Sequence, residues 1–188
     1  GEPGCSRIGT ACSPDDDWAQ DLPGDRSLLF VRAGAPAGGS GTRGSPFGSI
    51  VEALAAAGPG TVVALSKGRF DEVVVVPSGV TVWGACVAET TVASSVASDL
   101  DATVAAGGAE AEVRNLRIGG ERKGVSATGS AVSLALRDVL VERAVSRGVY
   151  VVGAGTLTAS NLVVRDTRAR PGDGLGGWGL QVGNLDSG

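Results

Sequence analysis

The chain has no histidine and no methionine among its 188 residues, and only 4% of its residues are aromatic. The absence of histidine excludes the imidazole group, which is the most frequent general base and transition-metal ligand in proteins. Because aromatic side chains are few and Met is absent, the core must be built from Val, Leu, Ile and Ala. Such side chains suit the regular layers of a β-sheet better than an irregular globule.

Long apolar runs and clusters of positive charge are also lacking. The longest apolar stretches, such as 73–76, are far shorter than the ~20 residues of a transmembrane helix. The net charge is −4, and the basic residues are scattered along the chain. We therefore expect no membrane span and no nucleic-acid partner. The polar start at 1–5 is unlike a signal peptide, and 179–183 resembles the middle of a strand layer, so we expect an excised piece truncated at its C-terminus.

The three cysteines allow at most one intrachain disulfide. Cys5 and Cys12 lie in residues 1–27, an irregular lead-in rich in Gly, Pro and Asp, and Cys86 follows an apolar strand. We predict a Cys12–Cys86 bridge, which would close a loop of about 75 residues and stabilise the fold by about 4 kcal/mol. Cys5 would remain for a partner upstream. The alternative is three free thiols in a cytosolic protein.

Residues 28–188 are predicted to form one β-rich domain. A short strand is expected at 28–31, and a helix over about 46–57, between Ser45-Pro46 and Gly58-Pro59. The segment 39–44 matches the G-x-G-x-x-G pattern of dinucleotide-binding loops. Pro46 delays the helix beyond the third glycine, and no acidic residue ends the next strand, so we reject nucleotide binding.

An internal repeat dominates the second half of the chain. The segments 113–118, 136–141 and 159–164 superimpose with a period of about 23 residues. A glycine followed by an apolar residue recurs downstream of each segment, at Gly124-Val125, Gly148-Val149 and Gly179-Leu180. The last repeat contains several extra residues around 170–174. Leucine-rich repeats have a similar period but need a different leucine pattern and a helical segment in each unit, which are absent here.

This period and the short strands predict an all-β fold, a right-handed parallel β-helix with ~23-residue coils. Equivalent inward side chains should stack from coil to coil, and each polar residue that precedes them should lie at a turn, where Asn and Asp tolerate left-handed backbone geometry. Two inner stacks are expected. The first consists of Leu116, Val139 and Leu162, and the second of Ile118, Val141 and Val164. The expected polar ladder is Asn115, Asp138 and Asn161.

The N-terminal half resembles the opening of the pectin-lyase-like β-helix superfamily. The matching residues lie in 39–54, 59–63, 68–72 and 80–84, and include Ser45-Pro46-Phe47, Pro59-Gly60-Thr61 and Gly68-Arg69-Phe70. The following Trp83-Gly84-Ala85-Cys86 is similar to uncharacterised secreted β-helix proteins of myxobacterial type. The resemblance implies that the helix caps the solenoid. It implies no single activity, because one fold serves many functions.

Enzymes of this superfamily act on polysaccharides along the outer face of the solenoid. Hydrolases of the polygalacturonase type combine aspartates with a histidine, which this chain lacks, and pectin methylesterases need two aspartates and an arginine. Lyases need a basic residue, often with calcium. In this chain the acidic residues expected at outward-facing strand positions are scattered and form no consistent pair. We therefore predict no catalytic residue, no metal site and no cofactor, with calcium only under a lyase alternative.

One irregularity could bind a ligand: the loop at 170–178, which ends in Trp178. An exposed Trp beside Arg and Asp suits sugar rings, whereas a Trp tucked under the loop would be a plug. We expect a secreted or cell-surface bacterial module, non-catalytic, for carbohydrate binding, adhesion or structure, with polysaccharide as partner. The alternative is the N-terminal part of a polysaccharide lyase or related enzyme with catalytic coils beyond residue 188. The candidate binding residues are Arg143, Arg165, Asp166, Asp173 and Trp178.

Overall fold

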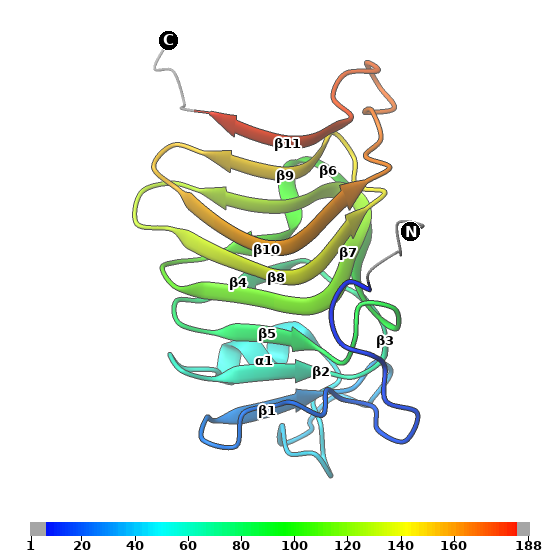
Figure 1. Cartoon of the computed structure of the whole chain (residues 1–188), viewed down its shortest axis with the longest axis vertical. Helices are drawn as coiled ribbons and strands as arrows, with labels where there is room; N and C mark the ends of the chain where they lie inside the picture. Colours follow the sequence, from blue (N-terminus) through cyan, green and yellow to red (C-terminus); the bar gives the residue numbers. More distant parts are fainter. Residues whose placement is uncertain (1–6, 184–188) are drawn as a thin grey trace, which may run out of the picture.

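Short parallel strands wind around a common axis, coil upon coil, with β1 at one end and β11 at the other (Figure 1). The computed structural model describes residues 7–183 and forms a parallel β-solenoid of about five turns with ~23-residue coils, as predicted. The elements are β1 (Leu28–Val31), α1 (Ile50–Ala56), β2 (Val62–Leu65), β3 (Gly68–Asp71), β4 (Val74–Val76), β5 (Thr81–Gly84), β6 (Thr90–Ala106), β7 (Ala111–Thr128), β8 (Ser133–Glu142), β9 (Arg147–Val152), β10 (Thr156–Arg165) and β11 (Trp178–Gly183).

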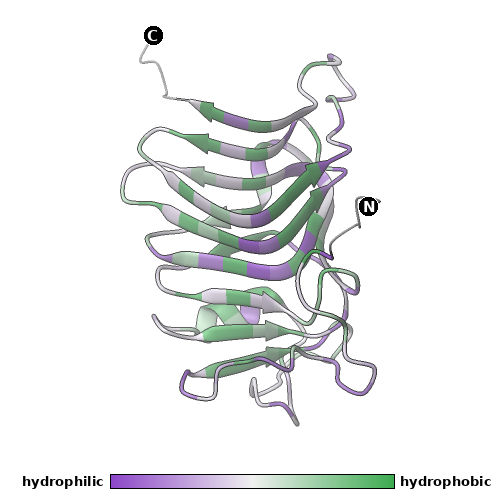
Figure 2. Ribbon diagram, in the orientation of Figure 1, coloured by the Kyte–Doolittle hydropathy of each residue, from purple (hydrophilic) through white to green (hydrophobic). Residues whose placement is uncertain are grey.

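The strands form three faces. The first face contains β1, β2, β5 and the starts of β7, β8 and β10. The second face contains β3, the start of β6, the middle of β7 and the ends of β8 and β10. The third face contains β4, the ends of β6 and β7, and then β9 and β11. Hydrophobic and hydrophilic bands alternate along many of these strands (Figure 2), as expected when successive side chains point in and out.

The interior consists of aligned aliphatic stacks. The strand register confirms both predicted stacks. In the first stack Leu116 pairs with Val139 and Val139 with Leu162, and in the second Ile118 pairs with Val141 and Val141 with Val164. Leu116, Ile118 and Val139 are fully buried. The repeated Gly–apolar position also aligns, because Val125 pairs with Val149, which pairs with Leu180. Burial of each such side chain contributes about 1.5–3 kcal/mol, so the coils are held by their stacks.

Two corners turn the chain between faces. Asn115, Asp138 and Asn161 lie at the first corner with φ of 57°, 54° and 51°, the left-handed geometry that Asn and Asp tolerate best. The Asn161 amide donates to Asp138 at 2.7 Å, whereas Asn115 donates to the carbonyls of the preceding coil. The second corner lies between the second and third faces. There, Arg143 and Asp166 also have positive φ, a feature that the repeat did not predict.

The helix α1 begins at Ile50 and is shorter than the predicted 46–57. The first residues of the predicted range are extended because Phe47 bonds both ways with the edge of β1: its N–H donates to Phe30 O, and its carbonyl accepts from Arg32 N–H, both at 2.9 Å. Ser49 then caps the helix, and its side chain accepts from Val51 N–H. The apolar side of α1 is buried at one end of the solenoid interior, as the resemblance implied.

The lead-in, described from residue 7, contains neither helix nor strand and is tied to the coils at several points. The predicted Cys12–Cys86 disulfide is confirmed, with the two Cα atoms 5.2 Å apart. Trp18 packs edge-on against Phe30 at 5.3 Å between ring centroids. In Figure 1 the lead-in, in blue, runs beside the coils toward β1. Cys5 lies outside the described residues.

No helix within residues 7–183 combines the length and the apolar character that crossing a membrane requires.

Candidate functional site

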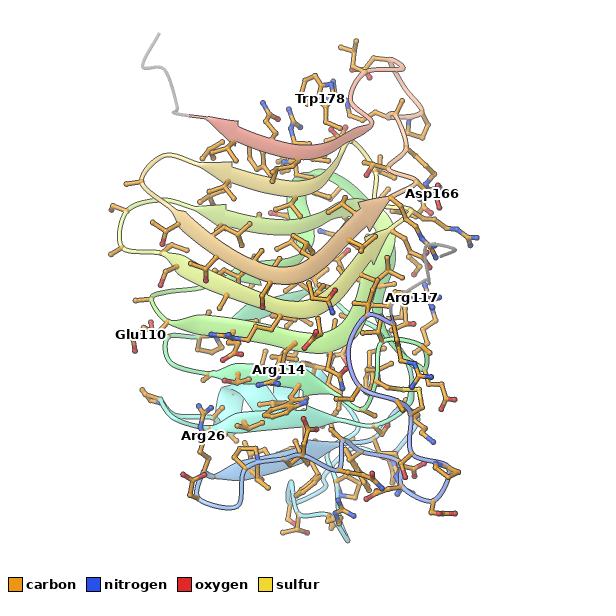
Figure 3. All side chains as sticks on the ribbon, in the orientation of Figure 1. Arg26, Glu110, Arg114, Arg117, Asp166 and Trp178 are labelled. Carbon is orange, nitrogen blue, oxygen red and sulfur yellow. A yellow bond between two sulfur atoms is a disulfide. The ribbon has the colours of Figure 1, made fainter. Side chains whose placement is uncertain are left out.

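The five residues predicted to bind carbohydrate fall into two separate regions. Arg143, Arg165 and Asp166 lie at the second corner, whereas Asp173 and Trp178 belong to the loop between β10 and β11 and to the start of β11. Figure 3 shows Trp178 at the β11 end of the solenoid and Asp166 lower on the side, beside the coils. The predicted set therefore does not form one site.

Asp173 is engaged within its own loop. Its carboxylate pairs with Arg170 at 2.6 Å and accepts from Leu175 N–H at 2.9 Å. An antiparallel bridge between Ala169 and Gly176 closes the loop at its base. Asp173 thus shapes the loop.

A cleft of about 360 Å³ lies between this loop and a protruding part of β6. The protrusion arises from two register shifts, between Ser94 and Ser98 and between Ser98 and Ala102, which push the residues on either side of Ser98 out of the ladder. Arg122 fixes it by donating to Val96 O at 2.7 Å. The residues that line the cleft include Ala97, Ser98, Asp99, Glu121, Arg170 and Asp173.

Beside the loop, two aromatic rings and two cations gather on the outer side of the third face. The Arg147 guanidinium lies 5.1 Å from the centroid of Trp178 and 4.9 Å from that of Tyr150, and Lys123 Nζ lies 4.9 Å from Tyr150. Gln181 accepts a hydrogen bond from Arg147. We call these five residues the aromatic–cation cluster.

Strand register creates this cluster. Trp178 pairs with Arg147 in the preceding coil, and Gln181 pairs with Tyr150. Parallel strands lie about 4.8 Å apart, so equivalent outward side chains on successive coils come into contact. Trp178 is 50% exposed, so its ring is not tucked under the loop as a plug.

Within the part of the chain that the structure describes, the cations of the cluster are not paired with acidic side chains. Neither Lys123 nor Arg147 forms an ion pair within 4.0 Å among residues 7–183. Burial and then the positive charge of Arg147 lower the pKa of Lys123, against the opposing effect of Asp101 and Asp99. Lys123 Nζ donates to Leu100 O at 2.9 Å, and the residue is only 7% exposed. Lys123 therefore contributes its positive charge from a buried position, whereas Arg147 is the cation that a ligand can reach.

Sequence reasoning identified Trp178 but missed the other four members of this cluster, although a signal was present for two of them, Lys123 and Arg147. Lys123, Arg147 and Trp178 each directly precede the glycine of the repeated Gly–apolar pair. They therefore occupy one position of the repeat, and a coil-by-coil alignment of that position would have gathered them.

At the second corner the predicted residue Arg165 is paired mainly with Glu142, a residue that was not predicted. Arg165 donates to Glu142 at 2.9 and 2.6 Å, and Arg117 lies 3.0 Å from the same carboxylate group. The hydrogen bond to Glu142 and its charge raise the pKa of Arg165. The carboxylate of Asp166 lies 3.9 Å from Arg165. Arg143 is exposed and has no ion pair within the part of the chain that the structure describes.

No family model, curated protein or solved structure matches the chain. The parallel β-solenoid is consistent with the pectin-lyase-like superfamily, and membership of that superfamily stays a prediction that rests on the residues quoted above.

Proposed function

We propose that the chain is a non-catalytic module that binds polysaccharide at the aromatic–cation cluster. The observation that carries this proposal is the half-exposed ring of Trp178 beside the accessible Arg147. An aromatic ring offers an apolar surface to the C–H face of a sugar, and the adjacent guanidinium and the Gln181 amide offer polar groups for its hydroxyls. Both aromatic residues belong to paired strands, so the surface is held rigid before a ligand arrives.

The geometry also suits a long ligand. The cluster spans successive coils on the third face, and the 360 Å³ cleft is lined in part by the 170–173 segment of the loop that precedes Trp178. A chain polymer can follow such a surface across several sugar units, so weak contacts at each unit add together. The Cys12–Cys86 disulfide supports a secreted or cell-surface location, because disulfides persist mainly in oxidising compartments.

Affinity electrophoresis tests the proposal. The protein is run in native gels that contain one polysaccharide each, from a panel of neutral and acidic plant, algal and bacterial polymers. We expect at least one polymer to retard the wild-type protein and to lose this effect with Trp178→Ala. Leu175→Ala is the matched control, because Leu175 is 59% exposed in the same loop but lies outside the cluster, and it should migrate like the wild type. Absence of retardation throughout, or equal retardation of Trp178→Ala, would overturn the proposal.

A polysaccharide lyase is the second candidate, favoured by one observation. Lys123 has a lowered pKa, which a catalytic base needs near neutral pH, and the charges of Asp99 and Asp101 act on it. Its low exposure and its bond to Leu100 O oppose this role. Incubation with pectate or alginate plus calcium separates the candidates. A lyase would generate the ultraviolet absorbance of unsaturated products, and we expect none.

A further inference from the structure

A second, smaller hollow lies on the second face, apart from the aromatic–cation cluster. It has a volume of about 160 Å³, and three arginines from different coils line it. They are Arg69 on β3, Arg117 on β7 and Arg143, which directly follows β8. We call this hollow the arginine groove.

Small residues create the groove. The outward positions between Arg69 and Glu142 are occupied by Ala93 and Gly119, which pair with each other in the ladder. A longer side chain at Ala93 would occupy the hollow, and at Gly119 a Cβ would already lie 2.4 Å from the carbonyl oxygen of Glu142, so the backbone approaches closely there. Thr91 also lines the groove and pairs with both Arg69 and Arg117. The floor therefore offers space together with a hydroxyl group.

The charge of the groove is positive and incompletely compensated. Its one acidic residue, Glu142, is already shared between Arg117 at 3.0 Å and Arg165 at 2.6 Å. Neither Arg69 nor Arg143 has an ion-pair partner within 4.0 Å among the described residues. Asp71 is an acid outside the lining, and its pKa is lowered first by the hydrogen bond from Ser95 N–H at 2.8 Å and less by the positive charge of Arg69.

One donor of a residue that lines the groove is also unused. The Nε of Arg117 is buried and has no hydrogen-bond partner within residues 7–183. A buried N–H without an acceptor costs about 1–3 kcal/mol, and a bound anion that reached it would remove this cost. The guanidinium group matches oxyanions well, because its planar N–H donors can bond two oxygens at once.

We propose that the arginine groove binds a tetrahedral oxyanion, namely phosphate or sulfate, free or as an ester on a glycan. At about 160 Å³ the groove is below the roughly 300–1,000 Å³ of pockets that enclose drug-sized ligands, so a small ion fits it better than a whole sugar ring. A doubly charged anion with four oxygens can engage three guanidinium groups together. This inference is independent of the proposed carbohydrate site, since the two share no residue.

Calorimetric titration with sodium phosphate and sodium sulfate tests the inference, against sodium chloride at equal ionic strength. We expect saturable binding of at least one of the two anions, and none of chloride. Arg69→Gln and Arg143→Gln should each weaken binding at least tenfold and the double variant should abolish it. Neither residue forms an ion pair within the described part of the chain, so both variants should fold. Arg137→Gln is the matched control, because Arg137 is an outward arginine of the first face that pairs with Glu112 at 3.0 Å.

Two further arms identify the source of the anion and the donor. If dextran sulfate competes with the free ion and unsulfated dextran does not, the site is assigned to glycan esters. Failure of dextran sulfate to compete would assign it to the free ion. In nuclear magnetic resonance spectra the Arg117 Nε–H signal should shift on anion addition. Heat that chloride reproduces, or unchanged binding in the double variant, would overturn the inference. Trp178→Ala should bind the anion as the wild type does, even if polysaccharide no longer retards this variant. Failure of the carbohydrate proposal can therefore be distinguished from failure of the anion proposal.

Discussion

At the first corner of the solenoid, three residues with the same backbone geometry have different surroundings. Asn115 is buried and donates to the carbonyls of Gly84 and Ala85, both at 3.0 Å, and its Oδ1 accepts from Thr10 N–H. Asn161 is exposed, and its amide donates to Asp138 and to no other side chain among residues 7–183. The sequence predicted the shared corner because the spacing and residue type are visible in it. The difference in burial arises from the lead-in crossing Asn115, which no local pattern encodes.

This difference predicts unequal costs. Asn115→Ala should lower the free energy of unfolding by about 3 kcal/mol, because it strands buried carbonyls and forces Ala into left-handed geometry. Asn161→Ala should cost about 1 kcal/mol. Asn115→Gly keeps the backbone relaxed and so isolates the hydrogen-bond contribution. Urea unfolding followed by circular dichroism measures all three, and equal costs at the two positions would contradict this description of the corner.

Among the elements, strands were easier to predict than the helix boundary. The period of the repeat fixes which strand residues point inward, so stacks such as Leu116 with Val139 follow directly. The helix start at Ile50 depends instead on two long-range contacts: the backbone pairing of Phe47 with β1 and the carboxylate of Glu72. Neither contact has a local sequence signal, so the helix was predicted to begin too early.

Glu72, which directly follows β3, caps the N-terminus of α1. Its carboxylate accepts from Ser49 Oγ at 2.7 Å, Ile50 N–H at 3.0 Å and Val51 N–H at 3.1 Å. Glu72→Ala should therefore lower the free energy of unfolding by about 2 kcal/mol, and Glu72→Gln by about 1 kcal/mol. Glu121→Ala, which removes an exposed ion pair with Arg168, should cost less than about 1 kcal/mol in the same urea titration. A Glu72→Ala cost as small as that of Glu121→Ala would refute the cap.

At the scale of the whole molecule, the interior of the solenoid repeats from coil to coil, whereas the loops and the outer surface do not. The repeat predicted the solenoid, and its extra residues predicted the loop that ends in Trp178. The β6 protrusion, the arginine groove and the place of Tyr150 and Gln181 in the aromatic–cation cluster could not be predicted residue by residue. They depend on which outward side chains the register brings together, and that register becomes certain only when all coils are aligned.

The lead-in is held to this assembly by the disulfide. Cys12→Ala should lower the free energy of unfolding by about 4 kcal/mol, because Cys12 and Cys86, 74 residues apart, would no longer restrict the unfolded chain. Reductant should destabilise the wild type by a similar amount and leave Cys12→Ala unchanged. Equal stability of the wild type with and without reductant would show that the bridge contributes nothing.

The most direct test of the central claim, that polysaccharide binds at the aromatic–cation cluster, is a tryptophan fluorescence titration. Trp18 and Trp83 are 4% and 7% exposed, whereas Trp178 is 50% exposed, so solvent-sensitive emission comes mainly from Trp178. On addition of a polysaccharide that retards the protein, we predict a blue shift of the emission and protection from acrylamide quenching. Both effects should be absent in Trp178→Ala. A spectrum that stays unchanged at saturating polysaccharide, or a shift that persists in Trp178→Ala, would contradict the claim.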